Sequence, residues 1–434
     1  MKRKTEKSRP DPVKGRAFAA EVKGRAFGSP LARGLYRRAS TAEMDPRAKP
    51  GAPSAVDPRA KPGAPAAVAA FRRKKVIDAL VARIEKKRIE LPSPCRIMEV
   101  CGTHTMTVHR YGLQTMLEKA GVEMISGPGC PVCITPGGIH EAAIRLVTEK
   151  ENLILATFGD MTRVPTRRGS LQKAVPAKGS AVRVVYSSEE SLDFARRNSD
   201  KEIVFFGVGF ETTIPSIALA AKSAAAEKLS NYSILSALWM IPPPLRAILE
   251  ADDVRISGFL YPGHVSAIIG QKPYEFVARE FGVPGVIAGF EPGDMLLGII
   301  SILDQIREGR PVVANEYTRV VRPEGNPVAL AVMREILEPK DACWRGLGLI
   351  PESGLRFRVR YAAYDAEIKH KLETEADEAD LPGCRCGDVL RGVLTPQACP
   401  LFGRRCAPES PSGPCMVSLE GACFIQYKYR GPRS

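Results

Sequence analysis

Thiols are the side chains best suited to do chemistry in this 434-residue chain, which has 11 Cys but only 5 His. Six of the cysteines follow the spacing C-x-C-x12-C-x6-C-x8-C-x7-C; they are Cys384, Cys386, Cys399, Cys406, Cys415 and Cys423. Thiolates at this density bind zinc or an iron–sulfur cluster. Structural zinc sites usually contain paired C-x2-C knuckles, often with His, and this stretch has neither. The spacing therefore favours a 4Fe–4S cluster beside a redox-active thiol pair.

A separate C-x2-C motif, Cys130-Pro131-Val132-Cys133, directly follows Gly127-Pro128-Gly129. On its own it could be half a zinc knuckle, a redox dithiol or an accident of sequence. The glycines and prolines predict a stiff turn with exposed backbone amides, which stabilise a thiolate by hydrogen bonding and lower its pKa. No second C-x2-C completes a zinc ribbon, so the motif favours thiol–disulfide exchange.

A third thiol, Cys101, is followed three residues later by His104. The two could form a thiolate–imidazole pair for nucleophilic catalysis. Cys101 could equally be a soft metal ligand, with His104 as its neighbour or as a second ligand. The residue types leave both interpretations open.

These motifs sit at the ends of short apolar runs. The runs cover residues 97–100, 122–126, 153–158, 203–206, 258–261 and 286–288, and helix-like stretches cover 71–89, 141–150, 216–228 and 294–308. Strands that alternate with helices predict parallel sheets covered on both faces. Ligands of such sheets bind at the carboxyl ends of the strands. We therefore expect the strand-end loops to form one or two composite sites in a cleft.

Two of the strand-end loops add a carboxylate and an imidazole to the candidate site. Glu211 lies in Gly209-Phe210-Glu211-Thr212-Thr213, and His264 follows Pro262-Gly263. Each could position a ligand or shuttle a proton. Each could instead cap a helix or brace a turn, and the segment from Glu211 to Pro215 is also typical of a helix start.

The net charge of +15 is confined to one end of the chain. Residues 1–75 hold 20 Lys and Arg against 6 Asp and Glu, which leaves 43 against 42 for the remainder. Residues 45–53 recur as 57–65, and such repeats rich in Pro, Gly, Ala and cations cannot bury enough apolar surface to fold. We expect residues 1–70 to be a disordered basic extension. Because the remainder is nearly neutral, we expect no nucleic-acid partner.

Other functional classes are excluded by what the sequence lacks. No apolar run approaches the roughly 18 residues that suggest a membrane span. The basic start at residues 1–4 is not followed by an apolar segment, so we expect no secretory signal, no membrane association and a cytoplasmic protein. There is no G-x4-G-K-[ST] phosphate loop.

The predicted fold is α/β, with a cysteine-rich end. We expect a first α/β domain at 71–200, which carries the Cys101 and Cys130/Cys133 loops, and a second parallel-sheet domain at 201–340. Residues 341–434 are expected to form an iron–sulfur domain.

These motifs together resemble those of the HypD family of hydrogenase maturation factors. The resemblance rests on residues 101–105, 127–133, 158–161, 209–215, 262–266, 383–387 and 415–423. It runs in order over roughly residues 75–430. Residues 1–70 have no counterpart in it.

The resemblance implies a scaffold that builds the Fe(CN)2CO group of nickel–iron hydrogenases. Cys101 would hold the iron that carries CN and CO, with His104 close by. A HypC-type chaperone would supply the second thiolate, and HypE would donate cyanide from a thiocyanate on its terminal cysteine. Cys130 and Cys133 would connect this site to a 4Fe–4S cluster.

The resemblance also implies which thiols hold the cluster. The expected ligands are Cys384, Cys399, Cys406 and Cys423, with Cys386 and Cys415 as the redox pair. In an extended segment we expect Cys384 and Cys386 to point to opposite faces, and so not to bind the same cluster.

Two alternatives belong to other classes. The first is an iron–sulfur-dependent thiol–disulfide oxidoreductase, which would not use Cys101 as an iron ligand. The second is a structural zinc protein that binds nucleic acid through its basic extension.

Overall fold

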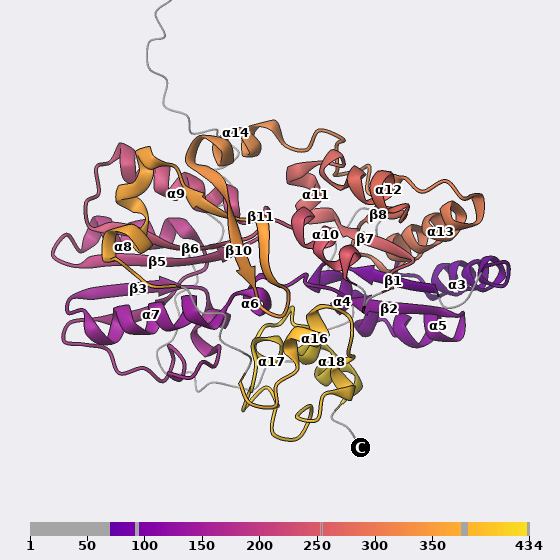
Figure 1. Ribbon diagram of the computed structural model, residues 1–434, viewed down its shortest axis with the longest axis horizontal. Helices are drawn as coiled ribbons and strands as arrows, with labels where there is room; N and C mark the ends of the chain where they lie inside the picture. The colour runs from indigo at the N-terminus through magenta and orange to yellow at the C-terminus, as the bar shows by residue number, and fades with distance from the viewer. Residues whose placement is uncertain (1–69, 92–94, 252, 254, 375–380, 432–434) are drawn as a thin grey trace, which may run out of the picture. The chain divides into compact units, whose positions relative to one another are not determined.

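The computed structural model describes residues 70–91, 95–251, 253, 255–374 and 381–431. The predicted disordered extension therefore lies outside the described residues, except for Ala70. Within the described ranges the chain forms two parallel sheets covered by helices, an antiparallel hairpin and a cysteine-rich segment at residues 381–431 (Figure 1). The predicted α/β class is confirmed.

The first sheet has the strand order β2-β1-β7-β8-β9, and all neighbouring strands are parallel. Its strands are β1 (Cys95–Glu99), β2 (Val122–Ser126), β7 (Gly258–Pro262), β8 (Gly285–Ala288) and β9 (Val313–Asn315). Its helices include α3 (Lys74–Arg88), α4 (Gly102–Arg110), α5 (Leu113–Lys119), α11 (Gly263–Ile269), α12 (Glu275–Phe281) and α13 (Pro292–Glu308). The inner strands β7 and β8 are buried along their whole length, as expected for parallel strands with helices on both faces.

The second sheet has the order β4-β3-β5-β6 and is also parallel throughout. Its strands are β3 (Leu153–Thr157), β4 (Ala181–Val184), β5 (Glu202–Gly209) and β6 (Tyr232–Leu238). Around it lie α7 (Gly137–Glu149), α8 (Ser188–Arg197), α9 (Ile214–Ala226) and α14 (Pro327–Ile336). The antiparallel hairpin of β10 (Leu337–Trp344) and β11 (Gly348–Phe357) packs against β6, and α10 (Pro242–Glu250) packs against β11.

The predicted division of the sheets at residue 200 is wrong. The first sheet takes two strands from residues 95–126 and three from residues 258–315, and the second sheet is formed by the chain between them. Strand β7 returns to pair with β1, where Phe259 lies beside Met98. That pairing leaves β1 with a parallel neighbour on each side, so its backbone groups are bonded within the sheet.

Each sheet has a point where the strand order reverses direction. In the first sheet the chain leaves β1 on one side to reach β2 and returns on the other side as β7. In the second sheet β4 and β5 flank β3 in the same way. Loops that diverge at such a point open a crevice at the carboxyl ends of the strands. The crevices are therefore expected at the loops after β1 and β7, and after β3 and β5.

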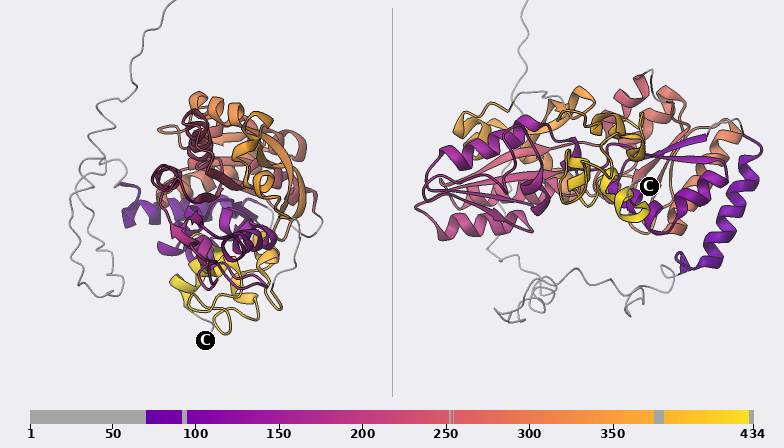
Figure 2. Two further views of the ribbon diagram at one scale, coloured as in Figure 1. Left: turned by 90° about the vertical axis from the view of Figure 1, so that its left-hand side faces the viewer. Right: turned by 90° about the horizontal axis from the view of Figure 1, so that it is seen from below.

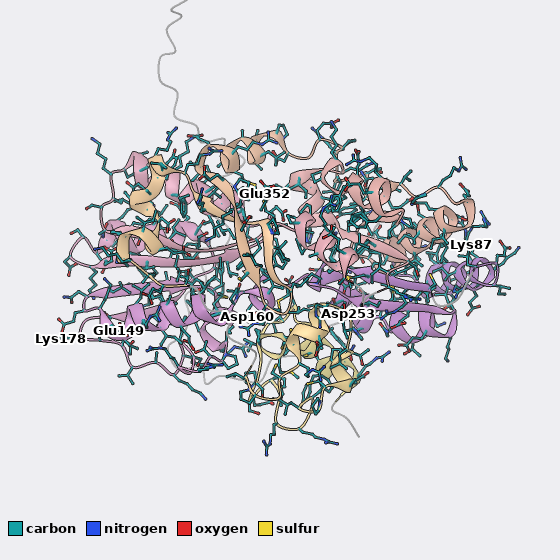
Figure 3. The ribbon with its side chains drawn as sticks, viewed as in Figure 1. Lys87, Glu149, Asp160, Lys178, Asp253 and Glu352 are labelled. Atoms are coloured by element: carbon teal, nitrogen blue, oxygen red, sulfur yellow. A yellow bond between two sulfur atoms is a disulfide. The ribbon has the colours of Figure 1, made fainter. Side chains whose placement is uncertain are left out.

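The cysteine-rich segment contains only short helices, α16 (Cys386–Leu390), α17 (Pro414–Val417) and α18 (Ala422–Arg430). Its interior combines sulfur atoms with Phe402, Met416 and Val417, each at most 1% exposed. Two views place the segment, in yellow, beside both sheets and next to α6 (Pro131–Ile134) (Figures 1 and 2). Asp160 and Asp253, which come from the two sheet regions, both lie beside it (Figure 3).

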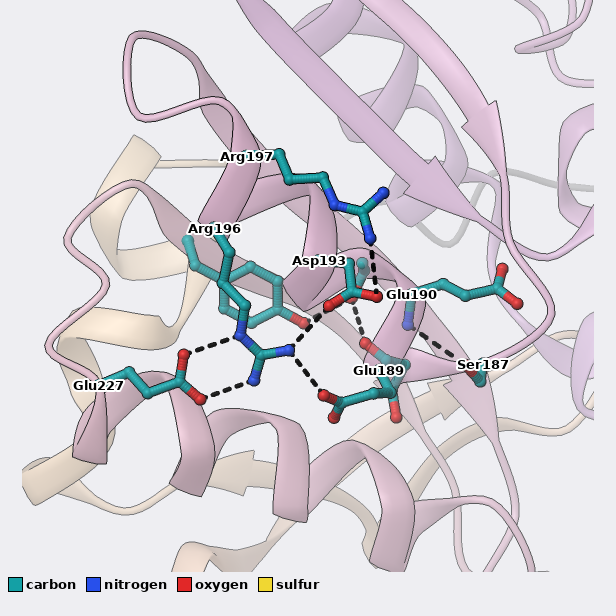
Figure 4. A network of polar contacts seen from close by, with 10 residues as sticks. Ser187, Glu189, Glu190, Asp193, Arg196, Arg197 and Glu227 are labelled. Atoms are coloured by element: carbon teal, nitrogen blue, oxygen red, sulfur yellow. Dashed lines mark hydrogen bonds and ion pairs between the residues drawn. The ribbon is translucent and has the colours of Figure 1, made fainter. Parts of the chain in front are cut away.

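Helix α8 shows how local sequence fixes an element away from the site. Ser187 caps the helix by accepting a 3.2 Å hydrogen bond from the Glu190 amide. Arg196 in the last turn forms a two-bond ion pair with Glu227 at 2.6 and 2.8 Å, which ties the end of α8 to the end of α9 (Figure 4). In the part of the chain that is described, no helix combines the length and the apolar character needed to cross a membrane.

Burial of His140 makes a specific prediction about acid stability. The ring packs edge-on against Phe206, neither ring nitrogen has a hydrogen-bond partner among the described residues, and burial lowers the pKa to about 3. Because the unfolded ring binds a proton below about pH 6.5 and the folded ring does not, His140 costs stability as the pH falls. We expect the difference in unfolding free energy between His140→Leu and the unchanged chain to shift by about 2 kcal/mol in favour of the variant when the pH falls from 7.5 to 5. Urea unfolding at both pH values measures this difference, and an equal effect of the substitution at both would contradict it.

Candidate functional site

Cys101 occupies the crevice of the first sheet. It is the residue before the first turn of α4, directly after β1, and its side chain is half-buried. The neighbouring Gly102 amide donates a 3.2 Å hydrogen bond to the Gly129 carbonyl, so the loops after β1 and β2 touch. A Cβ on Gly129 would lie 2.5 Å from the Cys101 Cα, which explains the glycine at that position.

Glu99, which was not predicted as a site residue, forms a hydrogen bond with the backbone of Cys101. Its buried carboxylate accepts a 2.9 Å hydrogen bond from the Cys101 amide and another from the Thr105 hydroxyl. Burial raises the pKa of Glu99 to about 8. A carboxylate inside the apolar run Ile97-Met98-Glu99-Val100 was the signal that could have identified it, since an acidic side chain is rarely buried without a role.

Glu420 brings the cysteine-rich segment to the same crevice. Its Oε1 accepts a 3.2 Å hydrogen bond from the Thr103 hydroxyl. A Cβ on Gly102 would lie 2.6 Å from the Glu420 carbonyl oxygen, so only glycine permits this approach. The two segments are far apart in the chain, and no local pattern indicated the contact.

Burial and the nearby charge of Glu420 determine the protonation of Cys101. Burial, followed by the negative charge of Glu420, raises the pKa of the Cys101 thiol to about 12, and hydrogen bonds from the backbone amides of His104 and Thr103 oppose the shift. In the protein without iron Cys101 is therefore a thiol at neutral pH. A cation such as iron at the sulfur would reverse this, because a metal-bound thiol is deprotonated.

Removal of the Glu420 charge should make Cys101 more reactive. We expect Glu420→Gln to keep the acceptor for Thr103 but to lower the pKa of Cys101, so that iodoacetamide alkylates it about three- to tenfold faster at pH 8. Glu409→Gln, an exposed acid of the same segment, is the matched control and should alkylate at the original rate. Peptide mass spectrometry of the 101-containing fragment over pH 7–10 reads the profile. Identical profiles for the two variants would show that Glu420 does not act on the thiol.

His104 and His264 both pack against one phenylalanine, Phe290. His104 is buried, and its Nε2 is 3.0 Å from the Gly289 carbonyl, to which it donates. Its Nδ1 has no hydrogen-bond partner among the described residues, and burial lowers the pKa of the ring to about 4. Phe290 packs against His104 at 4.9 Å and against the exposed His264 at 3.8 Å between ring centroids. The loops after β1, β7 and β8 thus bring both predicted histidines together.

Cys130 and Cys133 form a disulfide across the first turn of α6, with Cα atoms 5.3 Å apart. Both residues are buried, and the Cys133 amide lies 3.2 Å from the Cys130 sulfur. The Cys133 sulfur is 3.9 Å from the carbonyl oxygen of Pro414, the residue before Cys415. The C-x2-C motif therefore joins the Cys101 loop on one side to the cysteine-rich segment on the other.

Glu211 lies at the crevice of the second sheet, directly before α9. Its Oε1 accepts a 3.0 Å hydrogen bond from the Ile241 amide, and its Oε2 has no partner in the described ranges. Burial raises the pKa of Glu211 to about 7. It lines a cavity of about 270 Å³ whose other walls come from α11, α14 and the β10–β11 hairpin. The Glu211 side chain forms neither a hydrogen bond nor an ion pair with Cys101.

Five of the six clustered thiols line one small cavity. They are Cys384, Cys386, Cys399, Cys406 and Cys423, and the remaining wall is formed by Arg385, Val389, Leu401, Phe402 and Met416. The side chain of Cys386 hydrogen-bonds with Cys384, Cys423 and the sixth thiol, Cys415. The Ser412 amide donates a 3.3 Å hydrogen bond to the Cys406 sulfur.

The expectation that Cys384 and Cys386 point to opposite faces is wrong. A Cβ on Gly413 would lie 2.6 Å from both of their sulfur atoms, so the two thiols face the same side. Side chains two residues apart share a face even in an extended chain. Here the chain is not extended, since Arg385 has φ −119° and ψ 28° and Cys386 begins α16.

A loop at residues 413–421, named here the thiol loop, contacts the thiol cavity, the Cys130–Cys133 pair and the Cys101 loop. Gly413 lies against the Cys384 and Cys386 sulfurs, Pro414 against Cys133, and Glu420 against the Cys101 loop. The Leu419 amide donates to Asp160 at 3.2 Å, and Arg163 donates to the Val417 carbonyl at 3.0 Å. Asp160 and Arg163 follow β3, so both sheet crevices face this loop.

The donor set of the thiol cavity fits an iron–sulfur cluster. Its walls combine soft sulfur donors with apolar side chains, and an amide hydrogen bond stabilises one sulfur, as such clusters require. Among the described residues, no group of three or more His, Cys, Asp or Glu surrounds a single metal-ion position.

The two crevices, the disulfide and the thiol cavity define an α/β protein whose Cys101 loop contacts a cysteine-rich segment. Comparison with known proteins gives the family. A HypD family model, described as the hydrogenase formation hypA family, matches residues 75–430. The chain belongs to the HypD family of hydrogenase maturation factors.

Individual relatives agree. HypD of Rhodobacter capsulatus is 44% identical over 372 residues, which cover 84% of this chain and 98% of that protein. HypD2 of Bradyrhizobium diazoefficiens is 44% identical over 366 residues, covering 83% and 95%. HypD of Escherichia coli is 41% identical over 361 residues, covering 83% and 96%. The resemblance inferred from the motifs is confirmed, and with it a role in hydrogenase maturation.

Proposed function

We propose that this protein is the cytoplasmic scaffold on which the Fe(CN)2CO group of nickel–iron hydrogenases is assembled. The observation that carries the proposal is the placement of Cys101. It is a half-buried thiol at the strand-order reversal of the first sheet, held by Glu99 and Glu420 and adjacent to a dithiol. A thiolate at that position can hold iron while leaving one side accessible to a second ligand.

The iron is the cargo of this site. Cys101 supplies one thiolate, and a HypC-type chaperone supplies the second from outside the chain. His104 and His264 flank the same crevice, which supports a role for His264 in positioning the incoming ligand. Glu211 lies at the other crevice, where burial raises its pKa to about 7. We propose Glu211 as the proton donor at that crevice.

Cyanide transfer needs two electrons, and a dithiol supplies that number. When HypE presents a thiocyanate, cleavage of its S–C bond gives a thiol and cyanide. The balanced step is RSCN plus two thiols giving RSH, CN⁻, a disulfide and H⁺. Cys130 and Cys133 are the two thiols, and the cyanide carbon binds the iron. The disulfide between them is the oxidised state that this step leaves.

The dithiol must then be reduced again. The cysteine-rich segment is placed to support this reduction. Pro414 of the thiol loop contacts Cys133, and the adjoining Cys415 makes a side-chain hydrogen bond with Cys386. We propose Cys384, Cys399, Cys406 and Cys423 as ligands of a 4Fe–4S cluster, and Cys386 with Cys415 as the redox pair. The cluster, when bound, stores and releases single electrons.

Infrared spectroscopy tests the proposal. The chain is co-expressed anaerobically with a HypC-type chaperone and HypE and is purified as a complex. Bands of iron-bound cyanide and carbonyl are expected, and they should shift when the cyanide carries ¹³C or ¹⁵N. A complex without these bands that still reduces disulfides would favour the alternative, an iron–sulfur-dependent thiol–disulfide oxidoreductase. The Cys130–Cys133 contact with the thiol loop is the observation that supports that alternative.

A further inference from the structure

A pair of exposed cations lies in the chain between residues that line the thiol cavity, and no part of the proposed assembly chemistry uses them. Cys399 and Cys406, which both line the cavity, are the two ends of one tight turn. Hydrogen bonds of 3.1 Å from the Phe402 amide to Cys399 and of 2.9 Å from the Cys406 amide to Leu401 close that turn. Arg404 and Arg405 stand on it, and both are exposed.

These arginines have no ion pair among the described residues. Two other arginines of the segment are paired: Arg385 pairs with Asp388, and Arg391 pairs with Asp388 at 2.8 Å and with Asp253. The charge of an exposed cation without an ion-pair partner can attract an approaching anionic group over a Debye length of about 8–10 Å. Glu409 is the one exposed acid on the same stretch, 399–410, of the described chain.

The cavity is closest to solvent on this segment at Cys384. Five of the six clustered thiols are buried, whereas Cys384 is partly exposed. Consecutive Cα atoms are about 3.8 Å apart, so Arg405 and Arg404 lie within about 8 Å of the Cys406 Cα. Arg404 and Arg405 are thus immediate chain neighbours of Cys406, one of the thiols that line the cavity.

From this placement we infer that the Arg404–Arg405 turn is the electron-entry surface, on which an acidic one-electron carrier protein docks. The inference rests on the proposed cluster and adds where its electrons arrive. Electron-transfer complexes are small and short-lived, and charge complementarity gives them fast, orientated association. One electron would pass from the reduced carrier to a cluster held by these thiols. No bond forms or breaks, and no proton moves.

Equilibrium binding is the primary test, and it needs no loaded cluster. The probe is an oxidised, strongly acidic plant-type ferredoxin, titrated against the full chain over a salt series. The variant is Arg404→Glu/Arg405→Glu. The control is Arg83→Glu/Lys86→Glu, which makes the same charge change at two exposed positions of α3. All three proteins retain residues 375–380, which have four acidic side chains in the sequence. A difference in binding between the proteins therefore does not come from these acids.

We expect the arginine variant to bind the probe at least about tenfold more weakly at low ionic strength, and the difference to disappear at high salt. Stopped-flow reduction of the cluster by reduced ferredoxin should slow by about tenfold or more. Reduction by the methyl viologen radical cation should not slow, because that donor gains nothing from positive charge.

Equal affinities and rates for the two charge-reversed proteins would overturn the inference while leaving the assembly function intact. Absence of acid-labile sulfide from the unchanged protein would instead refute the proposed cluster. The two failures are therefore distinguishable.

Discussion

A Cys101→Ser variant is expected to fold normally and to leave hydrogenase immature. Serine is close to cysteine in size, and the hydrogen bond from the residue-101 amide to Glu99 does not depend on the side chain. An uncharged hydroxyl is a poor substitute for the soft thiolate that is proposed to hold the iron. We expect hydrogenase activity in a complemented deletion strain to fall by at least about 100-fold. Activity after anaerobic growth measures the loss.

Cys343→Ser is the matched control for this experiment. Cys343 is also half-buried but lies in β10, away from the crevice of the first sheet. Both variants should unfold within a few degrees of the unchanged chain, and only the Cys101 variant should fail in maturation. If the serine at 101 still matures active hydrogenase, Cys101 does not hold the iron.

A Gly413→Ala variant is expected to lose the metal content of the cysteine-rich segment. Gly413 has an extended backbone at φ −157° and ψ 162°, which alanine also adopts, so the effect is steric. The new Cβ would lie 2.6 Å from both the Cys384 and Cys386 sulfurs. Overpacking of this kind costs about 1–3 kcal/mol, and here the atoms that must move are the proposed ligands. Iron and sulfide assays of the anaerobic protein measure the result.

Gly159→Ala provides the control for that steric argument. A Cβ on Gly159 would meet its nearest neighbour, Val184, at 3.7 Å, an ordinary contact distance. It should retain the iron content of the unchanged chain. Full retention of iron by Gly413→Ala would mean that the Cys384 and Cys386 thiols do not surround the cluster as proposed.

Much of the fold could be predicted because buried parallel strands leave a strong local pattern. The apolar runs at residues 97–100, 153–158 and 203–206 became β1, β3 and β5. Strand β4 was missed because it is a partly exposed edge strand that includes Arg183, and β9 because it has only three residues. The return of the chain from β6 to the first sheet was also missed, since β1–β7 pairing depends on tertiary contacts that no local periodicity reports.

The site could be predicted where one motif carries its own chemistry. The positions of Cys101, His104 and His264 follow from strand ends, and the structure brings them to one crevice. The role of Glu420 could not be predicted, because its contact with Thr103 spans the length of the folded chain. The shared side of Cys384 and Cys386 was not predicted, because the chain turns at Arg385 into α16 and only tertiary packing against Gly413 shows where both sulfurs lie.

The most direct test of the account is the iron and acid-labile sulfide content of the full chain purified without oxygen. We expect roughly four iron atoms and four sulfides per chain, with visible absorption that bleaches on reduction. We further expect Cys399→Ser and Cys406→Ser each to abolish both, and Cys343→Ser to retain them. Colourless protein that contains zinc and no sulfide would contradict the account at its centre.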